Sequence, residues 1–150
     1  MAKKKTELRY YEAIGRRKSA TCRVRLYLVN KEGEASAGEL KMKKGQIFVN
    51  KRIIAEVYPG DVNKQKYLMP FKLTNTEDRF ATSIHVRGGG KKGQIDAIVL
   101  GESRALQMVD ATLRPALKKA KLLTRDPRVR ESRKVGKGGK ARRAKQSPKR

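Results

Sequence analysis

The most restrictive feature of the sequence is an excess of positive charge that is concentrated at one end. The chain has 150 residues, with 39 lysines and arginines against 14 acidic residues, a formal net charge of +25. Residues 128–150 hold eleven of these basic residues, one acidic residue and only four apolar ones. Such a segment cannot bury enough surface to offset the entropy of ordering it, so we expect it to be disordered in isolation. A fold must therefore be built from the residues before it.

Length and charge together predict one basic domain with two extensions. We place a globular domain at residues 9–126, a short basic extension at 1–8 and an extended basic tail at 127–150. An excess charge of this size destabilises a compact state unless a polyanion neutralises it. Nucleic acid is the leading candidate for that polyanion. An anionic membrane surface comes second, because the chain has no run of about 18 apolar residues.

The N-terminal sequence and the cysteine content favour a cytosolic protein. The chain starts with MAKKKTEL, in which no apolar segment follows the lysines, so a secretory signal is not predicted. Cys22 is the only cysteine, which argues against a disulfide framework and against a cysteine-based zinc site.

The clearest structural signal is a strict alternation of residue types in residues 19–29, SATCRVRLYLV. The predicted inward side chains are Ala20, Cys22, Val24, Leu26 and Leu28, and the outward ones are Thr21, Arg23, Arg25, Tyr27 and Val29. A period of two over this length predicts a half-buried strand. Residues 79–87 alternate in the same way, and 10–14 and 47–49 are predicted to be shorter strands.

Helical spacing dominates the second half of the domain. Apolar residues follow a helical period from 95 to 109, although Glu102 interrupts them, and a second helix is predicted at 111–123. Before these, we predict an exposed loop at 30–44, a helical turn at 52–57 and a short helix ending before Pro70. Strands first and helices last indicate an α+β fold, with the helices on one face of a mixed sheet.

A literal G-x-G-x-x-G occurs at residues 88–93, inside HVRGGGKKGQ. A dinucleotide-binding unit would need a further strand after the helix, and the pattern that follows is helical. A Walker loop would need Lys-Ser or Lys-Thr after Gly93, where Gln94 stands. Two readings remain: a plain turn between strand and helix, or a phosphate site built from backbone amides, Lys91 and Lys92.

No set of residues with catalytic or metal-binding spacing is visible. His85 is the only histidine and falls on the polar face of its strand, and Cys22 falls on the inward face. We therefore predict no enzyme activity, no metal and no cofactor. The basic residues are the stronger functional signal, and Arg16, Arg17 and Lys18 form one cluster of them. The tail lacks aromatic residues, so we expect it to contact phosphates, which carry no sequence information.

Four stretches in this order resemble one family. They are Tyr11-x-Ala13-x-Gly15-Arg16-Arg17-Lys18-Ser19-Ala20, residues 85–90 with Gly93-Gln94 behind them, Leu122-Leu123-Thr124-Arg125-Asp126, and a basic tail ending in Lys149-Arg150. Together they resemble the small-subunit ribosomal protein nine family, in its bacterial or organellar form. The resemblance covers residues 9–150. The chain departs from the family at a longer segment 30–45, at Lys121 in place of glycine and at Pro148 near its end.

The resemblance implies a mixed sheet of about four strands packed by helices, with a left-handed βαβ crossover. It implies that the domain binds ribosomal RNA in the head (the 3′ major domain) of the small subunit, beside neighbouring ribosomal proteins of the head. The tail would approach the anticodon stem-loop of P-site transfer RNA through Lys149 and Arg150. The residues expected to bind ribosomal RNA are Arg16, Arg17, Lys18, Arg23, Arg25, Arg87, Gly88, Gly89, Gly90, Lys91, Lys92, Arg125, Arg128, Arg130, Arg133, Lys134, Lys137, Lys140, Arg142, Arg143 and Lys145.

Two other classes of function remain as alternatives at this point. One is a free-standing RNA chaperone without a fixed assembly, which would separate from the small subunit in a high-salt wash. The other is a nucleotide-dependent enzyme, which would bind a cofactor through the isolated domain.

Overall fold

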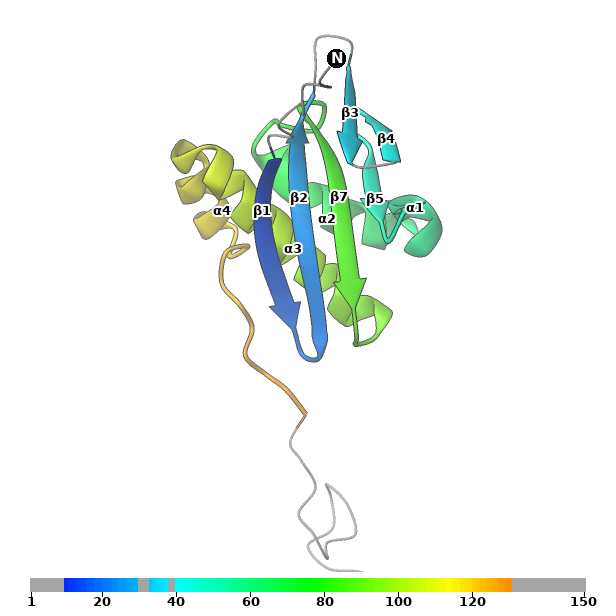
Figure 1. Cartoon of the computed structure of the whole chain (residues 1–150). Helices are drawn as coiled ribbons and strands as arrows, with labels where there is room; N and C mark the ends of the chain where they lie inside the picture. The colour runs from blue at the N-terminus through cyan, green and yellow to red at the C-terminus, as the bar shows by residue number, and fades with distance from the viewer. Residues whose placement is uncertain (1–9, 30–32, 38–39, 131–150) are drawn as a thin grey trace, which may run out of the picture.

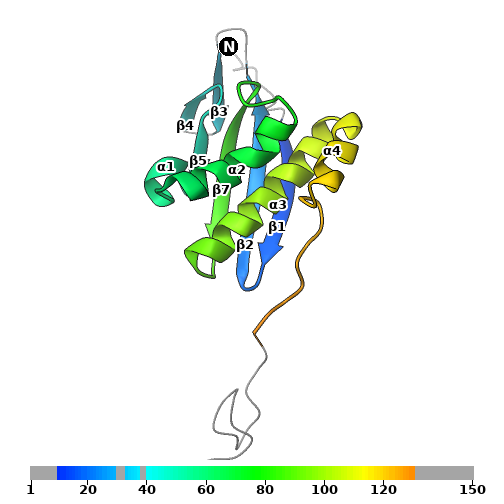
Figure 2. The same ribbon diagram turned by 180° about the vertical axis from the view of Figure 1, so that it is seen from behind.

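A computed structural model describes residues 10–29, 33–37 and 40–130, and it has the predicted α+β architecture (Figure 1). Five strands form one sheet: β1 (Tyr10–Arg17), β2 (Ala20–Leu28), β7 (Phe80–Arg87), β5 (Ile47–Val49) and β6 (Arg52–Ile53), in that spatial order. The helices are α1 (Ile54–Val57), α2 (Asp61–Leu73), α3 (Lys91–Val109) and α4 (Arg114–Lys119), with a 3-10 turn η1 (Ala111–Leu113) before α4. Helices α2 and α3 cover one face of the sheet, and the opposite face of its central strands carries no helix (Figure 2).

The sheet is mixed, and its one parallel pair has an unusual connection. β1, β2 and β7 are antiparallel neighbours, whereas β5 runs parallel to β7. From β5 the chain passes through β6, α1 and α2 before entering β7. Figure 2 shows these helices in front of the sheet, both strands pointing down, and β7 to the right of β5. That arrangement is a left-handed crossover, against the right-handed rule that nearly all such connections obey.

The main core lies between the sheet and α3, where the inward faces of the two alternating strands pack against a helix. Val24 and Leu26 of β2 and Ile84 of β7 are buried against Ile98 and Leu106 of α3. The predicted inward face of β2 is correct except at its last residue, because Leu28 is 40% exposed. Glu102, which interrupts the apolar pattern of the helix, lies in this core with no exposed surface.

The predicted loop at 30–44 is wrong within its described part. β3 (Glu34–Ala37) and β4 (Leu40–Lys43) pair there as an antiparallel hairpin. Met42 and Ala35 of this hairpin cover Tyr27 and Ala81, so Tyr27 faces away from the helices as predicted but is only 4% exposed. Polar and apolar residues alternate in both strands, but each alternation covers only four residues, and the hairpin is stabilised by packing against a distant part of the sheet.

Two helix boundaries also differ from the predictions. α2 continues past Pro70 to Leu73, with the buried proline inside the helix. Tertiary burial of Pro70 and Phe71 offsets the backbone hydrogen bond that proline removes. The last helix is a 3-10 turn followed by α4, which ends at Lys119 instead of extending to 123. Its end is closed by Lys121, which adopts a left-handed φ of 58° and donates its backbone N–H to the Lys118 carbonyl.

Candidate nucleic-acid interface

The glycine run after β7 is shaped by packing against the β1–β2 turn. Gly88 and Gly89 both have φ of +69°, in the left-handed region that favours glycine. A Cβ on Gly88 would lie 2.7 Å from the Ser19 carbonyl oxygen, and one on Gly89 would lie 2.8 Å from Cβ of Ala20. At Gly90 no atom would be met within 4 Å. The first two glycines are therefore required by the fold, and only the third borders open space.

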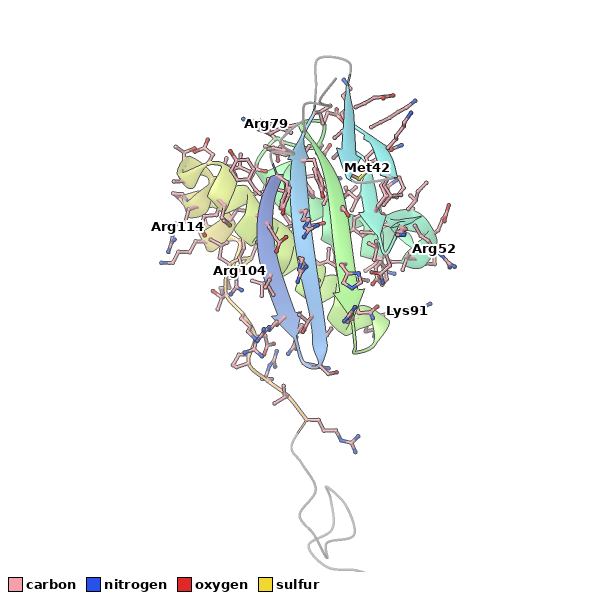
Figure 3. The ribbon with its side chains drawn as sticks, viewed as in Figure 1. Met42, Arg52, Arg79, Lys91, Arg104 and Arg114 are labelled. Atoms are coloured by element: carbon pink, nitrogen blue, oxygen red, sulfur yellow. The ribbon has the colours of Figure 1, made fainter. Side chains whose placement is uncertain are left out.

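Gln94 closes this loop at the position where a Walker loop has a lysine. Its side-chain nitrogen donates to the Gly88 carbonyl at 3.0 Å, and its oxygen accepts from the Tyr58 hydroxyl at 2.9 Å. Lys91 and Lys92 follow at the exposed start of α3, where Figure 3 labels Lys91 beside the end of β7. The loop thus presents two ammonium groups on a rigid turn.

The structure separates the three residues of the Arg16-Arg17-Lys18 cluster. Arg16 and Lys18 are exposed, and Lys18 has a left-handed φ of 52° in the β1–β2 turn. The Arg17 side chain is only 14% exposed and is used within the chain. Arg17 is therefore poorly available to RNA, and we assign it a positioning role instead.

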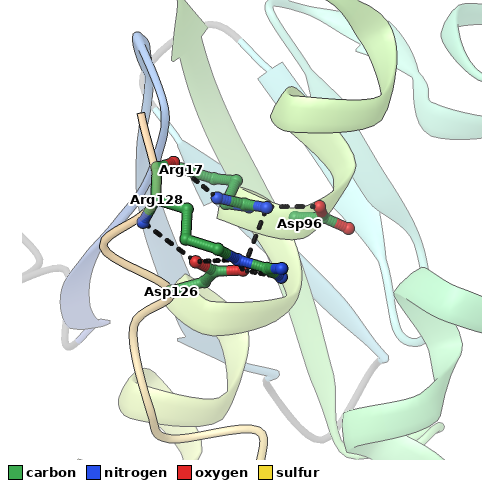
Figure 4. A network of polar contacts seen from close by, with 4 residues as sticks. All are labelled: Arg17, Asp96, Asp126 and Arg128. Atoms are coloured by element: carbon green, nitrogen blue, oxygen red, sulfur yellow. Dashed lines mark hydrogen bonds and ion pairs between the residues drawn. The ribbon is translucent and has the colours of Figure 1, made fainter. Parts of the chain in front are cut away.

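Arg17 holds the first residues of the tail against the body of the protein (Figure 4). Its guanidinium lies 3.0 Å from the Asp126 carboxylate and 3.6 Å from Asp96 of α3, and it donates to the Arg128 carbonyl oxygen at 2.9 Å. Arg128 also pairs with Asp126, with a shortest separation of 2.6 Å. The hydrogen bonds from Arg128 lower the pKa of the Asp126 carboxyl well below its usual range. We call this group of four residues the tail clamp.

We expect Arg17→Gln to release the first residues of the tail, which we call the tail root. The fold should remain intact, because the clamp lies at the protein surface, where β1 ends. Arg16→Gln is the matched control: it removes the same charge from the adjacent, exposed position. A spin label at Val129, paired with one on the exposed Lys92, should give a narrow distance distribution in the unaltered chain and in Arg16→Gln. The distribution should be broad in Arg17→Gln. Equal widths in all three chains would show that the clamp does not hold the tail.

A second basic surface lies on the helix-free face of the sheet. Arg23 and Arg25 of β2 point to this face as predicted, and β7 places His85 opposite Arg23 and Arg87 opposite Thr21. Arg25 is partly neutralised, because its Nε lies 2.6 Å from the Glu12 carboxylate and its guanidinium lies over the Tyr10 ring. Arg23 is freer, at 3.6 Å from Glu12 with 54% of its side chain exposed.

The remaining predicted contacts lie on or beyond the tail root. Arg125 and Arg130 are exposed, and 83% of the Arg128 side chain is exposed. The predicted residues from Arg133 to Arg150 fall outside the described part of the chain. Sequence reasoning missed Lys51, which sits beside Arg23 on the helix-free face, and Lys121, which sits near the clamp. The Asn50-Lys51 pair after a short apolar strand was the available signal for a tight turn.

Other kinds of site find no support in the described residues. Within residues 10–29, 33–37 and 40–130, no three histidine, cysteine or acidic side chains gather as metal ligands. None of the helices described is both long and apolar enough to cross a bilayer. Cys22 is buried, donates to the Ala97 carbonyl oxygen at 2.9 Å, and has a pKa raised to about 12, mainly by desolvation.

Comparison with known proteins shows similarity over most of the chain. The family model described as ribosomal protein S9/S16 matches residues 15–150. A small ribosomal subunit protein uS9 from Mesomycoplasma hyopneumoniae (strain 7448) is 42% identical over 144 residues, covering 96% of this chain and 97% of the relative. One from Chlorobium limicola is 39% identical over 125 residues, covering 83% and 86%.

The described part of the chain is an α+β domain with exposed basic side chains, and it holds the first residues of the basic tail. The chain belongs to the ribosomal protein S9/S16 family. It is accordingly a structural protein of the translation machinery and not an enzyme.

Proposed function

We propose that this chain is a structural constituent of the small ribosomal subunit in the cytoplasm, where its body binds ribosomal RNA of the head and its tail extends toward P-site transfer RNA. The relatives named above are small ribosomal subunit proteins and match it over nearly their whole length. Neighbouring ribosomal proteins of the head are the other expected partners.

The observation that carries the proposal is the tail clamp at the start of the most basic segment. The clamp joins β1 to residues 111 positions later and fixes where the tail leaves the body. The eleven basic residues of 128–150 then continue from this fixed origin. An extended chain spans about 3.3 Å per residue, so this segment can reach a ligand tens of ångströms from the domain. A fixed origin and long reach suit a tail that passes through ribosomal RNA.

Two basic surfaces of the body are assigned to ribosomal RNA. One comprises the exposed β1–β2 turn, the glycine loop and the start of α3, with Arg16, Lys18, Lys91 and Lys92. The other is the helix-free face with Arg23, Arg25 and Arg87. In the tail, Arg125 to Lys145 are assigned to ribosomal RNA, and Lys149 and Arg150 to the backbone of the transfer RNA anticodon stem-loop.

The transfer RNA role predicts a small, charge-dependent loss when the tip is removed. Deleting Ser147 to Arg150 should spare subunit assembly and weaken P-site transfer RNA binding by about 1 to 2 kcal/mol, for two charge-assisted contacts. Because phosphates carry no base identity, initiator and elongator transfer RNAs should lose similar affinity. The measurement is filter binding to reconstituted small subunits at several salt concentrations.

A matched variant keeps the tail length and replaces only Lys149 and Arg150 with alanine. It should weaken binding as much as the deletion does. Unchanged affinity in both variants would show that the tip, with Pro148 inside it, does not reach transfer RNA. Head binding is tested separately by hydroxyl-radical footprinting of the assembled RNA, and protection confined to another domain would contradict it. Loss of the chain from subunits in a high-salt wash would favour a free-standing RNA chaperone.

A further inference from the structure

A hollow of about 260 Å³ opens on the helix-free face of the sheet, which the proposal above assigns to ribosomal RNA without defining a site on it. It is lined by Arg23 and Arg25 of β2, Ser83, Ile84 and His85 of β7, Asn50 and Lys51 of the β5–β6 turn, and Leu40 of β4. None of these lining residues is acidic, and three are permanently basic. The nearest acid is Glu12, which pairs closely with Arg25 and more loosely with Arg23.

The turn that forms one wall of the hollow is fastened to β7 by a side chain. The Asn50 amide nitrogen donates to the Val86 carbonyl at 3.1 Å, and its amide oxygen accepts from the Val86 N–H at 3.0 Å. The Asn50 backbone N–H also donates to the Ile84 carbonyl at 2.9 Å. Three hydrogen bonds therefore hold the turn in one place beside Ser83 and His85. The wall of the hollow is rigid before any ligand arrives.

Lys51 occupies a backbone position that glycine would fill with less strain. Asn50 and Lys51 have φ of 49° and 70°, as the two-residue turn between β5 and β6 requires. Asparagine tolerates this left-handed conformation, and glycine is the usual residue at the second position. A lysine there costs folding stability and in return places an ammonium group at the rim of the hollow. Backbone strain of this kind is concentrated at functional sites, although it also occurs at helix ends such as Lys121.

The polar groups around the hollow are mainly hydrogen-bond donors. The Lys51 ammonium and the Arg23 guanidinium have no acceptor role. His85 accepts a hydrogen bond at Nε2 from Arg87 Nε at 2.9 Å, which leaves Nδ1 to carry its proton. Glu12 engages Arg25 closely and Arg23 only at 3.6 Å, so the Arg23 guanidinium and the Lys51 ammonium are the donors suited to a phosphate group. The concave shape and small volume suit one nucleotide and not a double helix.

We propose that this hollow binds a single nucleotide of an unpaired ribosomal RNA segment, with Lys51 and Arg23 contacting its phosphate. The inference rests on the proposed function and adds a specific site to it. Unpaired RNA is the form whose nucleotides can be splayed out into a protein surface. The phosphate contact accounts for a lysine at this strained position, because the binding free energy from the contact offsets part of the folding stability that the turn loses.

Substitutions of Lys51 distinguish its effect on folding stability from its effect on RNA binding. Lys51→Gly should stabilise the fold and lower the equilibrium constant of unfolding about twofold to fivefold. Glycine relieves the left-handed backbone strain, and this gain exceeds the additional chain entropy that glycine loses on folding. The same change should weaken binding of the full chain to purified small-subunit ribosomal RNA about threefold to tenfold, and reduce the salt slope by about one. Lys51→Asn, which also tolerates the turn, should weaken binding equally. Lys64→Ala, an exposed lysine of α2 on the helical face, is the control for loss of one charge.

The outcomes distinguish the site from the general function. If the unaltered chain does not bind the RNA, the proposed function fails and the site fails with it. If it binds, but Lys51→Gly loses no more affinity than Lys64→Ala, only the site is overturned. In amide NMR spectra, hexauridylate should shift Lys51, Ser83 and His85. Stronger shifts at these positions with a hexaglutamate peptide would overturn the assignment to RNA in favour of an acidic protein partner.

Discussion

Replacing Glu102 with leucine is expected to stabilise the folded chain by about 2 kcal/mol or more at pH 7, a large effect for one residue. Glu102 has no exposed surface, and neither carboxylate oxygen has a hydrogen-bond partner. Ile98 and Leu106 lie four residues before and after it on the same face of α3, and both are buried core residues. Leucine of similar volume would keep the packing and remove the cost of burying an unpaired polar group.

The effect of Glu102 should depend on pH in a defined direction. Burial raises the pKa of its carboxyl well above the usual 4.5, because desolvation penalises the charged form. The native state therefore holds this proton more tightly than the unfolded state. Its contribution to stability is present below the unfolded pKa and is lost progressively as pH rises from there toward the folded pKa. Stability of the unaltered chain should decline across that window, and the decline should be smaller in Glu102→Leu.

Urea unfolding at pH 5 and pH 8 measures both parts of this prediction. The gain from Glu102→Leu should be larger at pH 8 than at pH 5. Glu56→Leu, at an exposed position in α1, is the control for loss of an acidic residue from a strongly basic chain. A gain from Glu56→Leu equal to that from Glu102→Leu would show that net charge, and not burial, is responsible.

Gly15→Ala is expected to destabilise the fold by about 3 kcal/mol or more, the second large effect. A Cβ at Gly15 would lie 1.9 Å from the Ala97 carbonyl oxygen and 2.7 Å from the backbone nitrogen of Gly101. Both are backbone atoms of α3, so no side-chain rotation can relieve the clash. The strand would have to move away from the helix and open the core between them.

Gly90→Ala is the matched control, because a Cβ there would meet nothing within 4 Å and the residue has φ of −102°. Its free energy of unfolding should change by less than about 1 kcal/mol. Guanidinium or thermal unfolding of both variants gives the comparison. A loss in Gly15→Ala no greater than that in Gly90→Ala would mean that β1 and α3 do not approach as closely as these distances require.

The close approach at Gly15 also bears on the proposed function. Gly15 seats β1 directly on α3, and Arg17 follows two residues later on the same face of the strand. This seating brings Arg17 within 3.6 Å of Asp96 on α3 and leaves the rest of its guanidinium for Asp126. A glycine in the sequence motif thus sets the position of the arginine that holds the tail root.

Local patterns in the sequence were sufficient to find the elements that build the core. Alternation located β2 and β7, and helical spacing located α3, because each contributes a continuous apolar face whose period is visible over eight or more residues. Charge counting predicts a separate basic tail on the same local basis. The short β3–β4 hairpin and the continuation of α2 beyond Pro70 were missed, since their apolar contacts are with residues far away in the sequence.

By itself, then, the sequence determined the α+β class and the strongly basic character, which follow from local period and composition. Only the tertiary structure decided which basic side chains are exposed and which are paired within the chain. It turned Arg17 inward to Asp126, paired Arg25 with Glu12, and brought Lys51 beside Arg23 from another strand pair. The reason is physical: the availability of a charge depends on its partners within a few ångströms, and those partners come from elements that the chain brings together only when it folds.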